Sequence, residues 1–168
     1  MVPALTLTSI ESEGAVTELA RLASEIWHEY FVTILSDDQI DYMVDKFQSY
    51  SALTDQIRHQ GYEYYFMTVE NRYIGYLGIK QEDGKLFLSK FYIQKEHRGK
   101  GYASQAMEHL VAVCQNRGLR AIWLTVNRYN ASTIAVYEKK GFKTIRTQVA
   151  DIGGGFVMDD YVMEKQIL

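Results

Sequence analysis

The segment from Phe91 to Ala103 carries the residue types best suited to holding a charged ligand. An apolar strand pattern ends at Ile93, a short loop follows, and a helical pattern begins after the loop. The loop and the first helical turn hold basic, small and glycine residues: Arg98, Gly99, Lys100, Gly101, Tyr102 and Ala103. Such a junction points backbone N–H groups and the positive end of a helix dipole at one place. The segment therefore predicts a binding site for phosphate or another anion.

Two familiar phosphate motifs do not fit this segment. A P-loop would need Ser or Thr after its lysine, but Gly101 and Tyr102 follow Lys100. A dinucleotide fingerprint would need a third glycine where Ser104 stands, and an acidic residue after the next strand, where Asn127 stands. Both readings are set aside.

A third pattern does fit, and it extends well beyond the loop. Arg-x-x-Gly-x-Ala at 98–103 is followed by the strand 122–126, by Asn-Arg-Tyr-Asn at 127–130 and by Ala-Val-Tyr-Glu-Lys-Lys-Gly-Phe at 135–142. This series resembles the acetyl-CoA-binding core of the GNAT N-acetyltransferase superfamily. Its motifs occupy roughly residues 85–145, and the order of strands and helices extends the resemblance over the whole chain.

The resemblance implies acetyl-CoA as co-substrate, no metal, and a set of site residues. The implied cofactor-binding residues are Ile93, Arg98, Gly99, Lys100, Gly101, Tyr102, Ala103 and Asn130. Backbone N–H groups of the loop would hold the pyrophosphate, and Asn130 would contact the pantetheine arm. Tyr137 would protonate the departing thiolate. Asn130 and Tyr137 are seven residues apart, two helical turns, and so share a helix face.

The implied reaction is direct attack of an amine on the thioester, with a backbone N–H near Ile93 stabilising the oxyanion. An alkylammonium has a pKa of about 10.4, so a proton must be removed first. Here the chain departs from the family pattern, because 86–93 contains no acidic residue. Glu29, Asp159 and Asp160 are the candidate bases or substrate-binding acids. Adjacent strand residues point to opposite faces, so at most one of Asp159 and Asp160 can face a given pocket.

Three further segments, 27–30, 39–43 and 151–164, look like a bacterial subgroup that contains polyamine N-acetyltransferases. This resemblance implies a small cationic acceptor such as spermidine or spermine. Trp27, Glu29 and Tyr30 could line a cation pocket, although core packing also explains Trp27. Two rivals stay open: a protein or peptide N-acetyltransferase, and a CoA-binding sensor module that has lost turnover.

Charge is distributed unevenly along the chain. The first 84 residues hold 5 basic and 14 acidic side chains, a net −9, and the remaining 84 hold 13 and 7, a net +6. A basic half suits an anionic cofactor and an acidic half suits a cationic acceptor, although ordinary solvent-exposed surfaces explain such charge counts equally well. The isoelectric point near 5.8 and the absence of a continuous basic stripe argue against nucleic acid as a partner.

Composition indicates one ordinary globular domain over residues 1–168, with 47% apolar and 23% charged residues. The single Cys114 excludes a disulfide framework and falls in an apolar helical stripe, which favours a core thiol in a reducing, cytoplasmic compartment. The four histidines lack metal-ligand spacing, and no apolar run is long enough for a membrane span. We expect neither a metal, nor export, nor membrane insertion.

The elements that must position these residues follow from hydrophobic periodicity and turn signals. Helices are predicted at 15–30, after a capping box at Ser36, from about 52 to Gly61, at 101–117 and at 130–140; strands are predicted at 62–70, 73–80, 85–93, 121–126, 142–149 and 156–164. Short links predict antiparallel neighbours, and the strand, helix and strand in the middle predict one parallel crossover. The fold class is α/β or α+β: a single GNAT-like domain with a mixed, mostly antiparallel twisted sheet and helices on both faces. The terminal strand Phe156–Glu164 is expected to be exposed and able to pair between subunits, which leaves a homodimer open.

Overall fold

The structure, a computed structural model, describes residues 2–168 and contains one seven-stranded sheet in this range. The elements are β1 (Thr6–Ser9), α1 (Glu13–Tyr30), α2 (Asp37–Gln48), α3 (Tyr50–His59), β2 (Tyr62–Val69), β3 (Arg72–Glu82), β4 (Lys85–Ile93), a 3-10 turn η1 (Lys95–His97), α4 (Tyr102–Arg117), β5 (Ala121–Asn127), α5 (Ala131–Lys139), β6 (Lys143–Gly153) and β7 (Phe156–Gln166). The strand order is β1-β2-β3-β4-β5-β7-β6. Only the β4–β5 pair is parallel, which confirms the predicted mixed, mostly antiparallel sheet.

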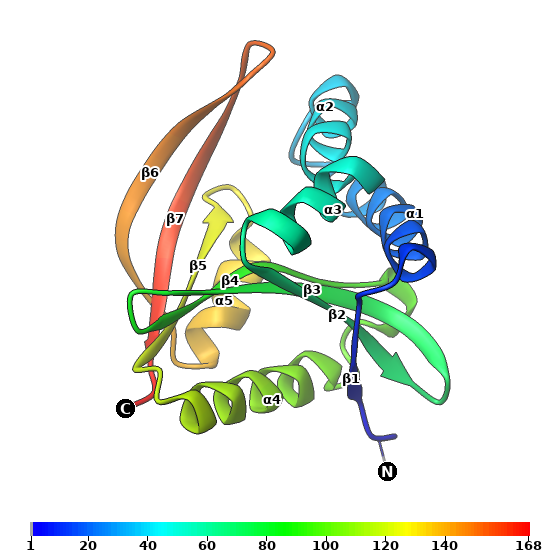
Figure 1. Cartoon of the computed structure of the whole chain (residues 1–168). Coiled ribbons are helices and arrows are strands. Elements are labelled where there is room, and N and C mark those ends of the chain that lie inside the picture. The colour runs from blue at the N-terminus through cyan, green and yellow to red at the C-terminus, as the bar shows by residue number, and fades with distance from the viewer. Residues whose placement is uncertain (1) are drawn as a thin grey trace.

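Helices cover both faces of this sheet (Figure 1). One apolar core joins the sheet to α1, α2 and α3, and a second core joins the opposite face to α4 and α5. Neighbouring residues on β2 supply both: Phe66 packs in the first core and Met67 in the second, and each is almost fully buried. This is the alternation expected of a strand buried on both faces.

Serine hydroxyls start the first three helices. Ser12, Ser36 and Ser49 each accept a hydrogen bond from the backbone N–H three residues later, which satisfies one free donor of the first turn. The start predicted at Ser36 is confirmed. Helix α3 begins at Tyr50, two residues earlier than expected, because Ser49 both ends α2 and caps α3.

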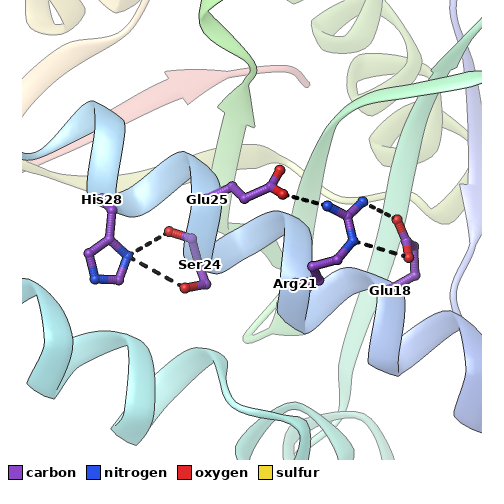
Figure 2. A network of polar contacts seen from close by, with 5 residues as sticks. All are labelled: Glu18, Arg21, Ser24, Glu25 and His28. Carbon is purple, nitrogen blue, oxygen red and sulfur yellow. Dashed lines mark hydrogen bonds and ion pairs between the residues drawn. The ribbon is translucent and has the colours of Figure 1, made fainter.

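The solvent-facing side of α1 is held by pairs one helical turn apart (Figure 2). Arg21 lies between Glu18 and Glu25 and is paired with both. His28 bonds to Ser24 within the helix, and its Nε2 lies 2.6 Å from Asp41 Oδ1 of α2. Exposed pairs of this kind contribute a few tenths of a kcal/mol each. The His28–Asp41 contact also connects α1 to α2, whose inner faces line the site.

Strands β4 and β5 pair over a short distance and then separate. The parallel register joins only Leu86 to Ile122 and Phe87 to Trp123. Beyond this point Ser89 is an extra residue on β4, because Gly78 pairs with Lys90 while the next residue of β3 pairs with Leu88. The separated carboxyl ends of the two strands leave a wedge inside the sheet, and the side chains around that wedge form the site.

The structure corrects one expectation about the C-terminal strand. The segment Phe156–Glu164 was expected at an exposed edge, but β7 pairs with β5 on one side and with β6 on the other. The exposed edge strand is therefore β6, and pairing between subunits through Phe156–Glu164 is wrong. The edge strand β1 is an addition to the predicted elements; its four residues are too few to show a clear pattern.

Within residues 2–168, no helix combines the length and the apolar character that crossing a bilayer requires.

Candidate active site

Two cavities meet in the wedge between β4 and β5. The strand cavity, of about 260 Å³, is lined by residues of β4, β5, β6 and β7 together with inner-face residues of α1 and α2. The glycine-loop cleft, of about 430 Å³, lies between the loop 97–101, the first turn of α4 and one face of α5. The residues that line both are Tyr30, Phe91, Tyr92, Thr133 and Tyr137. Two ligands bound in these cavities would therefore meet at these side chains.

The glycine-loop cleft opens onto the first turn of α4. Gly99 has φ +73° and Gly101, which precedes the helix, has φ +87°, conformations that favour glycine. A Cβ placed at either glycine would meet no atom within 4 Å. In the described chain no side chain caps this helix, so the N–H groups of its first turn have no helical partner and are available to an anion.

The predicted cofactor-binding residues divide into three groups. The cleft is lined by Ile93, Arg98, Gly99, Gly101, Tyr102 and Ala103. Lys100 is exposed and lies outside the lining of the cleft. Asn130 lines the strand cavity instead. The structure thus brings six of the eight residues to one cleft.

Arg98 and Glu29 form an ion pair beside the cleft. The Arg98 guanidinium donates two hydrogen bonds to the Glu29 carboxylate, at 2.6 and 3.1 Å, and its Nε donates to the Ile93 carbonyl at 2.8 Å. The same guanidinium lies 5.0 Å from the centre of the Tyr30 ring. Glu29 lines neither cavity. Its carboxylate holds the end of α1 against the loop and does not point into the site.

Asn130 occupies the start of α5. Its Oδ1 accepts from the Thr133 backbone N–H at 3.4 Å, and its Nδ2 donates to the Tyr30 hydroxyl at 2.6 Å. That hydroxyl is also bonded to the Thr133 hydroxyl. Asn130 therefore fixes the beginning of the helix that carries Tyr137, and connects it to α1.

Tyr137 lies where the two cavities meet and is only 9% exposed. Its ring centre is 5.4 Å from that of Phe142, so α5 and the following residues hold the ring in place. Burial raises the pKa of the Tyr137 phenol well above its ordinary value of 10.0. The hydroxyl therefore remains protonated at neutral pH and can act as a proton donor.

Asp160 supplies the carboxylate of the strand cavity. It lies opposite Asn127 of β5 and Gln148 of β6 in the strand register, and all three residues line the cavity. The Asp160 side chain is 5% exposed, and its Oδ1 has no hydrogen-bond partner in the described chain. The pKa of Asp160 is raised from 3.8 to about 6, chiefly by burial and also by neighbouring Asp159, while Lys90 opposes the shift.

Asp159 faces away from this cavity. Its Oδ1 lies 2.9 Å from Arg128 Nε, with the orientation of an ion pair and not of a directed hydrogen bond. The Arg128 guanidinium also lies over the ring of Tyr161. The expectation that at most one of the two adjacent acids faces a pocket is confirmed, and that acid is Asp160.

Sequence reasoning missed Lys90, the other charged residue of the strand cavity. Lys90 and Tyr92 follow the extra residue Ser89, which reverses the alternation of β4 and places both on the face covered by α1 and α2. Tyr92 packs edge-on against Trp27, Tyr30 and Phe31, which form an aromatic wall. A bulge leaves no clear signal in a single sequence, so only the aromatic part of this wall was predictable.

The amino-acid sequence that forms this site matches one known protein family. Residues 19–142 match the Acetyltransferase (GNAT) family. The chain belongs to the GNAT family. The resemblance carried by the glycine loop and by the residues around Tyr137 is therefore confirmed at the level of the family.

Individual GNAT relatives cover part of the chain. An uncharacterized N-acetyltransferase of Mycobacterium bovis is 31% identical over 100 residues, which span 59% of this chain and 64% of that protein. The [ribosomal protein bS18]-alanine N-acetyltransferase of Escherichia coli K12 is 36% identical over 56 residues, 32% of this chain and 38% of that protein. The chain thus spans less than two thirds of the length of these curated relatives.

Solved GNAT structures share the fold over nearly the whole chain. The PaiA N-acetyltransferase of Thermoplasma acidophilum, in complex with coenzyme A, superposes with a TM-score of 0.78 at 22% identity and covers 97% of this chain and 99% of its own. The ribosomal-protein-S18-alanine N-acetyltransferase of Escherichia coli gives 0.68 at 17% identity, over 97% and 94%. At these identities the likeness concerns the fold alone.

Proposed function

We propose that this GNAT protein transfers the acetyl group of acetyl-CoA to a primary amine of a small acceptor. The observation that carries the proposal is the meeting of the two cavities at Tyr137. The glycine-loop cleft would take the cofactor and the strand cavity the amine. A module that only binds CoA would need the glycine-loop cleft but not the strand cavity.

The residues of the cleft fit acetyl-CoA. The uncapped first turn of α4 and the open space at Gly99 and Gly101 suit a pyrophosphate, which needs N–H donors and close approach of the backbone. Ile93, Arg98, Tyr102 and Ala103 line the same cleft, and Glu29 holds the Arg98 side chain in place beside the loop. The bound cofactor supplies the acetyl thioester. We also propose that Lys100 and Asn130 contact the cofactor. Lys100 would do so from the exposed loop, and Asn130 from the adjoining strand cavity.

Tyr137 is the proposed proton donor to the leaving sulfur. Its phenol stays protonated at neutral pH because burial raises its pKa, whereas a free thiol has a pKa of about 8.5. A phenol within hydrogen-bond reach can therefore hold the thiolate and return a proton to it. A backbone N–H of β4 near Ile93 is the proposed donor to the developing oxyanion.

Asp160 is the proposed base. With a pKa of about 6 it is mostly ionised above neutrality, and its Oδ1 has no partner in the described chain. It can hold the incoming ammonium and accept a proton as the amine attacks. Asp159 and Glu29 are less suitable, because each is already paired with an arginine outside the strand cavity.

The class of acceptor is the finer part of the proposal. The acidic N-terminal half predicts a polyamine such as spermidine, which the aromatic wall of Trp27, Tyr30 and Tyr92 would suit, whereas the charges that line the cavity, Lys90 and Asp160, do not single out a polycation. A small acceptor is favoured over a peptide because the β6–β7 hairpin contacts α2 beside the strand cavity, where the Tyr42 hydroxyl donates to the Ile152 carbonyl at 2.8 Å. A cytoplasmic location and a homodimer remain predictions from the sequence.

The test is release of CoA thiol from acetyl-CoA against a panel of amines. The panel contains spermidine, spermine, diamines, amino acids and an N-terminal peptide, and the acetylated product is identified by mass. We expect saturable release with a small amine and little with the peptide. Tight acetyl-CoA binding without release for any amine would instead favour the sensor module, and release with the peptide alone would favour a protein acetyltransferase.

A further inference from the structure

The strand cavity carries one charge of each sign. Among its lining residues within the described chain, Lys90 and Asp160 are the charged side chains, and the others are aromatic, aliphatic or neutral polar. The wall is therefore close to neutral when both are ionised. A polycation placed here would meet one carboxylate and one competing ammonium group.

The two charges face the same cavity from different strands. Lys90 comes from β4, where the bulge at Ser89 places it on the same face as Tyr92. Tyr92 lies two residues nearer the carboxyl end of β4, where β4 and β5 have separated. Asp160 comes from β7 and is buried beside Asn127. Two strand residues span about 7 Å, so the Lys90 position is displaced along β4 from the end where Tyr92 and Tyr137 meet.

Neither charge is fully satisfied by the protein. The Lys90 ammonium donates to Ser89 Oγ at 2.8 Å and to the Ser89 carbonyl at 3.2 Å, which leaves one of its three N–H groups free. Asp160 Oδ1 has no partner. Among the ion pairs of residues 2–168, none joins Lys90 to Asp160 within 4.0 Å. Asp160 is buried and Lys90 is half-buried. Charged groups withdrawn from water normally find partners, so the space between these two suits a ligand that brings both.

We propose that the acceptor is an amino acid, whose amine lies beside Asp160 and whose carboxylate lies beside Lys90. This assignment rests on the proposed acetyl transfer and names the substrate class of the same site. The amine would then lie toward the junction with Tyr137, and the carboxylate deeper along β4. A cavity of about 260 Å³ suits a compact molecule of this size.

In this proposal Lys90 determines substrate specificity through its positive charge. Its ammonium attracts an acceptor that carries a carboxylate and repels an acceptor that carries a second ammonium at the same place. A polyamine and an amino acid therefore make opposite demands on this side chain, and removing its charge should change their affinities in opposite directions.

The experiment compares amines that differ only by a carboxylate: lysine with cadaverine, ornithine with putrescine, and arginine with agmatine. Dissociation constants are measured by calorimetry and kcat/KM by CoA release, with wild type, Lys90→Met and Lys90→Arg. We expect wild type to prefer the carboxylated member of at least one pair by about tenfold or more, the range of a hydrogen bond to a charged group. Lys90→Met should abolish the preference, and Lys90→Arg should retain most of it.

Lys80→Met is the matched control, because Lys80 is a lysine of β3 that lines neither cavity. It should keep the wild-type preference, and circular dichroism of each variant checks folding. Equal or tighter binding of the decarboxylated amines by wild type would overturn the amino-acid assignment, even with acetyl transfer intact. Because binding is measured separately, an amino-acid preference without any CoA release would support the assignment and contradict the proposed reaction.

Discussion

Asp159 and Asp160 are consecutive on β7, yet their carboxylates lie on opposite faces of the sheet. Asp159 is paired with Arg128, whereas Asp160 is buried in the strand cavity with one oxygen unpartnered. One residue of register therefore separates a carboxylate paired with an arginine from a carboxylate that lines the cavity and is available to a substrate. This relationship makes Asp160 the focus of two of the predictions below.

Tyr137→Phe should lower kcat by about 100-fold or more while leaving the dissociation constant of acetyl-CoA nearly unchanged. The phenyl ring preserves the packing against Phe142, but the proton donor is lost, and general acid catalysis contributes about 10²–10⁴-fold. Steady-state kinetics and calorimetry measure the two quantities. Tyr65→Phe, which removes a hydroxyl outside both cavities, is the control. Equal kcat in the wild type and Tyr137→Phe would remove Tyr137 from the mechanism.

Asp160→Asn should remove the acid limb of the pH–rate profile. In the wild type, kcat/KM should rise with pH through about 6, the pKa of Asp160, because the base must be ionised to accept a proton. The amide can accept a hydrogen bond but no proton, so the variant should be slow at every pH. Glu29→Gln should keep the limb, since Glu29 is paired with Arg98. A limb that survives in Asp160→Asn would mean that another group is the base.

Asp160→Asn should also make the protein more stable above pH 6. Folding raises the pKa of Asp160 from 3.8 to about 6, so the folded protein binds a proton on Asp160 more tightly than the unfolded chain does. The free energy of unfolding of the wild type therefore falls as pH rises from about 4 to 6, and it stays lower above pH 6. A shift of about two units corresponds to at most about 3 kcal/mol. Urea unfolding of both proteins at pH 4 and pH 7.5 measures the difference, and an equal stability gain at both pH values would contradict this origin.

Gly101→Val should weaken acetyl-CoA binding more than it destabilises the fold. Gly101 has φ +87°, and a side chain there would enter open space beside the first turn of α4. Gly118→Val at the other end of α4 is the matched control, with φ +67° and equally open surroundings. Both variants should lose about 1–2 kcal/mol of stability from backbone strain. Only Gly101→Val should raise the dissociation constant; equal effects on cofactor binding would place the pyrophosphate elsewhere.

Tyr76→Phe should destabilise the protein by about 1–3 kcal/mol, the cost of leaving buried polar groups unpaired. The Tyr76 hydroxyl accepts from Trp27 Nε1 and donates to Gln48 Oε1, each at 2.7 Å, and connects β3 to α1 and α2. Tyr73→Phe, on the exposed part of the same strand, should change stability by less than about 0.5 kcal/mol. Thermal and urea unfolding compare the two, and similar losses would mean that the buried hydrogen bonds contribute little.

Much of the site could be predicted because its determinants are local. Glycines, basic residues and a helix start lie within a few residues of one another, so the open loop at Gly99 and Gly101 before α4 could be predicted from the sequence. The same holds for Asn130 and Tyr137, which one helix face brings together. The choice between Asp159 and Asp160 was narrowed to one residue by strand alternation alone.

The rest depended on contacts between distant segments. The position of β7 between β5 and β6, the ion pair of Glu29 with Arg98, and the bulge that turns Lys90 into the strand cavity all join residues far apart in the chain. The hydrophobic periodicity of the sequence predicts that a strand exists and which of its residues share a face, but it does not predict which strand lies beside it. By itself, the sequence determined the family, the glycine loop and the helix that carries Tyr137. Only the tertiary structure decided the lining of the strand cavity, because strand order and register arise from competition among non-local pairings.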